Sequence, residues 1–409
     1  MAGKSLKILQ VLAVAFMLAA SGCTAMLEGE SRIRTAHYIP PYEAPPEQQI
    51  EISSYDELTA EILSLIMQHE STGSMYAVSY DGDVEQDVRR VCLEMRDDDP
   101  LVAYAVESMD GETKRIVSSY EIAISIEYRR TKQQVDSIVN VSTLRFLPTE
   151  ILSVMSAYQE ETVLRTSLRV TEEELTRYIK DEYYKNPRRI VMLPVVDIET
   201  YLSSGDDKIF ELRFGNTVQT GILRQYSVSL ADLYVRSNAL LAVGETDAEI
   251  LLSLAENLIA STEYDEAAAR TIGLHGAQNF AATAYGALAN GKAVGEGFAM
   301  AYKALCDELG LDCRVVLGYN DGRVHAWNIV WLSGYYYHID VAMCAANGIQ
   351  TAFLKTDEDF YDSYSWNTEA TVECEGTLTY FDIVGHEDEE EEEEGMDASY
   401  ATDGDEFPG

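Results

Sequence analysis

Apolar and polar residues between positions 50 and 244 follow helical and strand periods in turn. Apolar residues recur at helical spacing in SYDELTAEILSLIMQHE, DVEQDVRRVCLEMR and TEEELTRYIKDEYYK. The segments SMYAVSY, SSYEIAISIEYRR, RIVMLPVV and KIFELRFG are predicted to be strands. This order predicts two small α+β modules, over 50–140 and 141–244, and a divergent duplication would explain their likeness. Neither module carries polar residues at a catalytic spacing.

The pattern becomes clearer from residue 245 onward. TDAEILLSLAENLIAS, GAQNFAATAYGALAN and AVGEGFAMAYKAL are predicted helices, and the second of these should end at Gly291. CRVVLGYN, VHAWNIVW and YYYHIDVA are predicted strands, and the Ser-Gly pair in LSG between the last two indicates a tight hairpin. Residues 245–385 are therefore predicted to form an α+β core in which helices pack on an antiparallel sheet.

The first 22 residues have the pattern of an export signal. Lys4 and Lys7 precede the apolar segment ILQVLAVAFMLAA, which is too short to span a bilayer comfortably. The following ASGC resembles the bacterial lipobox, in which the cysteine, here Cys23, receives a lipid and becomes the mature N-terminus. Ala20 stands where leucine is usual, and an ordinary cleavable signal with Cys23 incidental is the alternative. We expect an exported protein, anchored through Cys23 to the outer face of a bacterial cell membrane.

Polar segments flank the predicted domains on both sides. Residues 23–49 include HYIPPYEAPPEQQ, whose prolines indicate an extended spacer. Residues 386–409 contain twelve acidic residues and no lysine or arginine, a composition typical of a disordered tail. The whole chain has 70 acidic and 30 basic residues, a net charge of −40. Because the phosphates of nucleic acid would be repelled, we expect no nucleic-acid partner.

Five cysteines remain besides Cys23, and an exported location permits disulfides between them. Cys306–Cys313 and Cys344–Cys374 are plausible pairs, which leaves Cys92 single, but spacing alone does not fix the connectivity. There is no CxxC pair and the six histidines are scattered, so no metal site and no cofactor are predicted.

Four ordered blocks in the C-terminal region resemble the transglutaminase-like superfamily, whose core is that of papain-like cysteine peptidases. The blocks are AVGEGFA, VVLGYN, HAWNIV and HIDVAM. The resemblance implies a cysteine nucleophile at a helix start, where the helix end and a nearby imidazole lower the thiol pKa. It matches His325 to the catalytic histidine and Asp340 to the aspartate that orients it. A hairpin with an even-length turn places both on one sheet face, at most about 7–8 Å apart at Cβ.

The nucleophile position of the family falls on Gly295, so the site is predicted to be vacant. Cys306 lies about 16 Å further along the same helix and cannot substitute. The family's D-x-T-W block is also altered, to DVAM. We expect Trp327 and Tyr285 to line the groove, with Tyr285 a candidate oxyanion donor. His338 shares the Asp340 face and is interpreted as filler or as a supporting hydrogen-bond donor.

These patterns favour an exported, lipid-anchored protein whose transglutaminase-like domain has lost catalysis and binds a peptide or cell-wall ligand. The alternative is an active transglutaminase-like or protease-like hydrolase that uses His325 and Asp340 with a different nucleophile or with water. In a third hypothesis the two N-terminal modules carry the function and the C-terminal domain is architectural.

Overall fold

A computed structural model describes residues 50–272 and 278–385 of the chain. The predicted signal peptide, the lipidation residue Cys23, the Pro-rich spacer and the acidic tail lie outside the described residues. Across the described ranges, no helix combines the length and the apolar character needed to cross a membrane.

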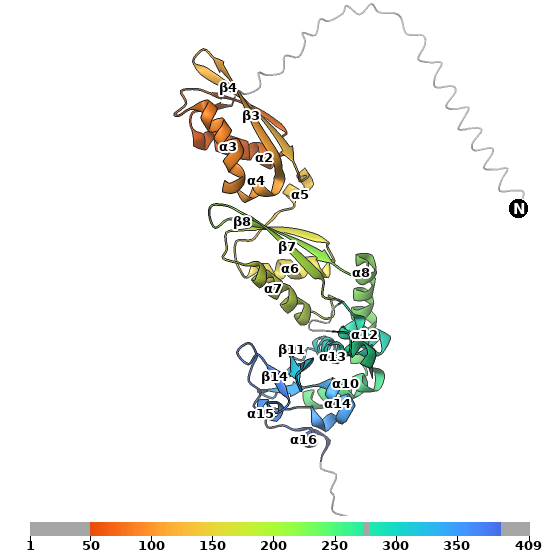
Figure 1. The fold of residues 1–409 in the computed structure, drawn as a ribbon. Coiled ribbons are helices and arrows are strands. Elements are labelled where there is room, and N and C mark those ends of the chain that lie inside the picture. Colours follow the sequence, from red (N-terminus) through yellow and green to blue (C-terminus); the bar gives the residue numbers. More distant parts are fainter. Residues whose placement is uncertain (1–49, 273–277, 386–409) are drawn as a thin grey trace, which may run out of the picture. The chain divides into compact units, whose positions relative to one another are not determined.

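The first module is built on a four-stranded sheet with strand order β1-β2-β4-β3 (Figure 1). Its long hairpin pairs the last two strands antiparallel. Ser54 caps the first helix, as the Ser-Asp start of that segment predicts. The elements are β1 (Glu51–Ile52), α2 (Tyr55–Gln68), β2 (Thr72–Ala77), α3 (Val84–Asp98), α4 (Pro100–Ala105), β3 (Val106–Ile116) and β4 (Ser119–Tyr128).

The second module has the same arrangement of strands and helices as the first. Its sheet has the order β5-β6-β8-β7, and its helices fall between equivalent strands. The helix predicted in TEEELTRYIKDEYYK is present, and Thr171 and Glu174 form a capping box at its start. The elements are α5 (Lys132–Asp136), β5 (Val139–Asn140), α6 (Phe146–Ser156), β6 (Glu161–Thr166), α7 (Glu172–Lys185), β7 (Val195–Leu202) and β8 (Lys208–Gly215).

One predicted strand of this module is displaced. RIVMLPVV is irregular up to Pro194, and β7 begins only at Val195. Ile190, Val191 and Met192 are almost fully buried, so their apolar character reflects core packing without a strand. Proline has no N–H for a sheet ladder, which places the strand start after it. An apolar run without alternation does not distinguish a buried strand from a buried loop.

The C-terminal domain confirms the predicted α+β architecture, with helices packed against an antiparallel sheet of order β13-β12-β11-β14 (Figure 1). Its elements are α8 (Thr220–Ser229), a π-helical segment (Leu230–Val235), α9 (Arg236–Ala239), α10 (Asp247–Ser261), β9 (Glu263–Tyr264), α11 (Glu266–Ala269), a 3-10 turn (Phe280–Ala282), α12 (Ala284–Asn290), β10 (Lys292–Ala293), α13 (Gly295–Leu309), β11 (Cys313–Asn320), β12 (Arg323–Leu332), β13 (Tyr335–Ile339), α14 (Val341–Asn347), a second 3-10 turn (Ile349–Thr351), α15 (Asp357–Phe360), β14 (Tyr364–Trp366) and α16 (Tyr380–Val384).

The helix predicted in GAQNFAATAYGALAN is shorter than expected. Helix α12 starts at Ala284, because the Thr283 side chain accepts from the Gly286 N–H and caps the helix there. It ends at Gly291, whose φ of +66° gives the left-handed C-cap that the sequence predicts.

The predicted hairpin between β12 and β13 is also present. Leu332 pairs with Tyr335, and the two turn residues Ser333 and Gly334 both have positive φ, of 53° and 95°. A two-residue turn of this kind matches the twist of antiparallel strands. It fixes the register that pairs Asn328 with Ile339 and so determines which residues share a face.

Helix α13 approaches its neighbours closely at its first turn. A β-carbon at Gly297 would lie 2.2 Å from the carbonyl oxygen of Ala281, so only glycine fits there. The Val294 N–H donates to the same carbonyl at 2.9 Å. Together these contacts fix the start of α13, and Gly295 with it, against the 3-10 turn.

Candidate functional site

The structure brings His325 and Asp340 together. His325 lies on β12, and Asp340 follows β13 as the N-cap of α14. Residue 327 would be the direct cross-strand neighbour of residue 340, so His325 occupies the diagonal position two residues away. The His325 Nε2 and Asp340 Oδ2 atoms are 2.6 Å apart.

Asp340 is a fully engaged carboxylate. It is 1% exposed, and its Oδ2 atom also accepts a hydrogen bond from the Tyr364 hydroxyl at 2.8 Å. The other oxygen, Oδ1, accepts from the Met343 N–H at 3.1 Å. A carboxylate held by donors from three elements cannot turn away, so the ring of His325 is held in one orientation.

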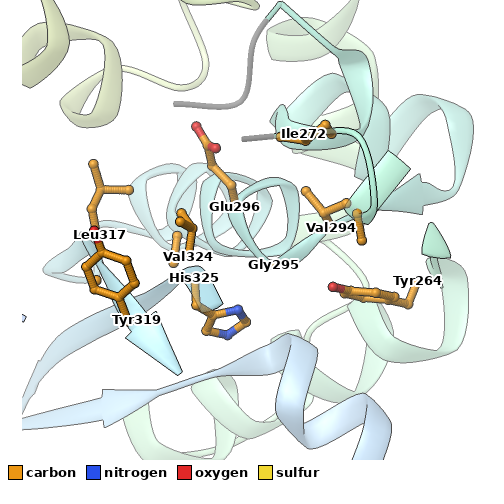
Figure 2. A pocket seen from close by; sticks show the side chains of 12 residues that line it. Tyr264, Ile272, Val294, Gly295, Glu296, Leu317, Tyr319, Val324 and His325 are labelled. Carbon is orange, nitrogen blue, oxygen red and sulfur yellow. The ribbon is translucent and has the colours of Figure 1, made fainter. Parts of the chain in front are cut away.

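The opposite edge of the His325 ring faces Gly295. A β-carbon on residue 295 would lie 2.7 Å from the ring Nδ1 atom and 2.6 Å from Cε1. Because Nε2 is bonded to Asp340, Nδ1 is the nitrogen directed at the start of α13. Figure 2 shows Gly295 and His325 on the wall of the same pocket.

Two opposing effects act on the pKa of His325. Burial of the ring lowers the pKa, and the adjacent Asp340 raises it through its charge and its hydrogen bond. The balance leaves the pKa of His325 above its ordinary value. Asp340 therefore favours the protonated form of the ring.

A pocket of about 160 Å³ lies over Gly295 and His325. Its walls are mainly apolar, and four large apolar side chains at its rim are 39–44% exposed. The lining residues are Tyr264, Ala269, Ile272, Val294, Gly295, Glu296, Leu317, Gly318, Tyr319, Val324, His325 and Ala326.

A known protein family matches the part of the chain that holds this site. Residues 238–341 match the family model of the transglutaminase-like superfamily, a stretch that includes Gly295, His325 and Asp340. The chain contains a transglutaminase-like domain. No curated protein matches the chain.

Two solved structures are similar at low identity. A structure described as a TGase is 11% identical over 62% of this chain and 68% of its own, with a TM-score of 0.25. A candidate cysteine protease from Cytophaga hutchinsonii is 13% identical over 36% of this chain, with a TM-score of 0.23. This chain covers 62% of that second protein.

Glu296 is a site residue whose environment the sequence did not reveal. It lies in the first turn of α13, beside the vacant position of the transglutaminase-like domain, and lines the pocket. The Tyr184 hydroxyl on α7 donates to its Oε1 atom at 2.8 Å. Burial raises the pKa of Glu296 to about 7, although the tyrosine hydrogen bond acts in the opposite direction. Tyr184 precedes Glu296 by 112 residues, and no spacing rule connects the two.

Trp327 and Tyr285 do not line the pocket of the transglutaminase-like domain, contrary to the prediction. Trp327 is 1% exposed and lies beneath the site, with its ring 5.1 Å from that of Tyr364. Tyr285 stacks on Tyr226 at 4.4 Å in a separate aromatic cluster. Both rings are used in packing. Trp327 shares the His325 face of β12 but is covered by the rings of Phe360 and Tyr364, and Tyr285 on α12 packs against Tyr226 of α8.

His338 is a structural histidine. The Trp327 Nε1–H donates to its Nδ1 atom at 2.9 Å, so its Nε2–H donates to Asp357 at 2.8 Å. Within residues 50–272 and 278–385, His338, Asp357 and Cys374 are the group of side chains close enough to hold a metal ion. Since Trp327 already occupies the Nδ1 lone pair, Nε2 carries the proton and has no lone pair for a metal.

The predicted disulfides are not formed in the structure, where the described cysteines are free thiols. Cys306 and Cys313 are buried and in contact with each other. Cys344 instead donates to the Ile349 carbonyl at 3.3 Å, and Cys374 contacts Asp357. The second predicted pair therefore has other partners.

Proposed function

We propose that the transglutaminase-like domain of this protein binds its ligand without cleaving or transferring it. The observation that carries the proposal is that residue 295 has no side chain and that the His325 ring lies over it. Acyl transfer through a thioester requires a sulfur at this position. Loss of the nucleophile from a catalytic triad typically costs on the order of 10⁶ in turnover.

Gly295 is not retained for backbone geometry, which supports this proposal. A β-carbon at Gly295 would come too close only to the His325 side chain, with the nearest backbone atom 3.5 Å away. A β-carbon at Gly297 would instead collide with backbone. The backbone of Ala281 thus excludes any side chain at 297, whereas a side chain at 295 would require only the His325 ring to shift.

Glu296 does not replace the missing thiol. A carboxylate is a weak nucleophile toward an amide, and this one accepts a hydrogen bond from Tyr184. Its side chain also points away from the His325 ring in Figure 2. The His325–Asp340 pair is left facing a pocket that can hold a ligand and has no group to attack it.

We further propose that the protein acts at the cell surface. The lipobox-like segment ending at Cys23 and the Pro-rich spacer support export and attachment to the outer face of a bacterial membrane. Peptides and the peptide part of cell-wall polymers are the ligand class that suits a domain of this kind.

The experiment is an assay of amide hydrolysis and of amine incorporation with the purified full chain. The proposal predicts no turnover above that of the His325→Ala variant. The competing function, hydrolysis by a water molecule that His325 activates, predicts turnover that His325→Ala abolishes. That result would overturn the binding proposal.

A further inference from the structure

The start of α13 is an unsatisfied hydrogen-bonding end that faces the pocket. Val294 is the N-cap residue, and its side chain accepts no hydrogen bond from the N–H groups of the first helical turn. The N–H groups of the first helical turn have no partner within a helix, and they carry its positive partial charge. Gly295 and Glu296 belong to this turn, and both line the pocket. Such an end is suited to an anionic oxygen.

A second donor points to the same place. The His325 side chain is 11% exposed, and its Nε2 atom is occupied by Asp340. Its Nδ1 atom has no partner among the described residues and faces residue 295. In the protonated ring, Nδ1–H is a charged donor directed at the helix start. The absent side chain of Gly295 leaves this position open to a ligand.

Other titratable groups around the two residues are compatible with an anion there. Asp340 and Tyr364 lie on the far side of the His325 ring, and Tyr184 is bonded to Glu296. Tyr264 also lines the pocket. The carboxyl of Glu296 becomes neutral on the acidic side of neutrality, because burial raises its pKa.

The remaining walls suit one apolar side chain next to the anion. The space of about 160 Å³ is roughly ten times what a single water molecule requires. Leu317, Tyr319 and Val324 present exposed apolar surface at its rim. Exposed apolar groups that converge on a pocket are typical of a binding site.

We propose that this pocket binds the C-terminal carboxylate of a peptide whose last side chain is apolar. The carboxylate accepts hydrogen bonds from the first turn of α13 and from His325 Nδ1–H, and the apolar side chain lies against Leu317 and Val324. The inference rests on the proposed function and specifies its ligand. The net charge of −40 favours peptides that are otherwise neutral or basic.

The test compares two forms of one peptide, acetyl-Gly-Lys-Gly-Leu with a free carboxylate and the same peptide as its carboxamide. Binding to the full chain is measured by calorimetry at about pH 6 and about pH 8. At the lower pH we expect the acid to bind at least about tenfold more tightly than the amide, since it alone forms charged hydrogen bonds. The preference should shrink at the higher pH, because Glu296 gains charge there and the protonated fraction of His325 falls.

Two variants identify the side chains that cause the preference for the acid. His325→Ala should remove the preference for the acid, whereas Glu296→Gln should keep it and weaken its pH dependence. Glu256→Gln, on the exposed face of α10, should change neither. Circular dichroism and the melting temperature check that each variant folds.

Equal binding of acid and amide, a preference for the amide, or no binding of either would overturn the carboxylate assignment. Mass spectrometry of the same mixtures reports separately on the proposed function. Cleavage of the peptide would overturn the binding-only proposal even if the preference for the acid were observed. An intact peptide without any preference would leave the proposed function in place and remove this inference.

Discussion

The Nδ1 atom of His325 lies 2.7 Å from the point where a β-carbon of residue 295 would be. The histidine therefore faces the nucleophile position of a transglutaminase-like domain and also fills part of the space that a nucleophile would need. Because Asp340 holds the other ring nitrogen, this orientation is built into the hairpin and does not depend on residue 295.

Gly295→Ala and Gly297→Ala should have different effects on stability. At 295 the new methyl group meets only the His325 ring, which has to retreat by about 1 Å to reach ordinary contact. We expect a change in the free energy of unfolding within about 1 kcal/mol. At 297 it meets the Ala281 carbonyl, and we expect a loss of about 2 kcal/mol or more. Urea unfolding of both variants measures this, and equal losses would contradict the assignment of roles.

Asp340→Asn should destabilise the protein in a pH-dependent way. The carboxylate raises the pKa of His325, against the effect of burial, so the protonated ring stabilises the folded state. That stabilisation is complete below the pKa of the unfolded histidine and is lost as the pH rises through the higher folded value. We therefore expect the stability difference between wild type and variant, about 1–3 kcal/mol, to be larger at about pH 6 than at about pH 8.5.

The control for that measurement is Asp357→Asn, which affects the other His–Asp pair. NMR titration should show the pKa of His325 falling in Asp340→Asn and not in Asp357→Asn. If the stability difference between wild type and Asp340→Asn grew with rising pH, Asp340 would not be the group that raises the pKa of His325.

Glu296→Gln should stabilise the protein at alkaline pH. The folded pKa of Glu296, about 7, exceeds the ordinary value of 4.5, so wild-type stability falls as the pH rises between these values. Glutamine carries no charge and still accepts from Tyr184. We expect little difference at about pH 4 and a more stable variant at about pH 8, by up to roughly 3 kcal/mol.

Chemical denaturation at the two pH values measures this effect, with Glu256→Gln as the exposed control. A Glu296→Gln variant that is less stable than wild type at about pH 8 would mean that the ionised carboxylate contributes favourable contacts.

Zinc should not stabilise the protein through His338, Asp357 and Cys374. The Trp327 N–H holds the Nδ1 lone pair of His338, which leaves a proton and no lone pair on the nitrogen that faces the other two side chains. We expect the melting temperature to be unchanged by added Zn²⁺ or by a chelator. A zinc-dependent rise that Cys374→Ser removes would contradict this reading of the cluster.

The sequence predicted the parts of the site that depend on local rules. Strand alternation and the Ser-Gly turn determine the hairpin, and the hairpin register places His325 diagonally to Asp340. Gly295 was recognisable because the blocks around it resemble a family pattern in which a cysteine stands there.

The remaining parts depend on contacts between distant segments. Tyr364 reaches Asp340 from β14, and Tyr184 reaches Glu296 from another module, and neither pairing leaves a signal in spacing. The prediction that Trp327 and Tyr285 line the groove is wrong because aromatic residues next to a site motif suit packing and ligand contact equally well. The structure resolves this by burying the first ring and stacking the second.

The most direct test of the vacant-nucleophile account is the reactivity of a Gly295→Cys variant toward iodoacetamide. If only the thiol is missing, the helix start and His325 should lower the pKa of the new cysteine. The account predicts rapid alkylation at neutral pH that is lost when Gly295→Cys is combined with His325→Ala. Alkylation of the introduced thiol at the rate of an ordinary exposed cysteine, unaffected by His325, would contradict it.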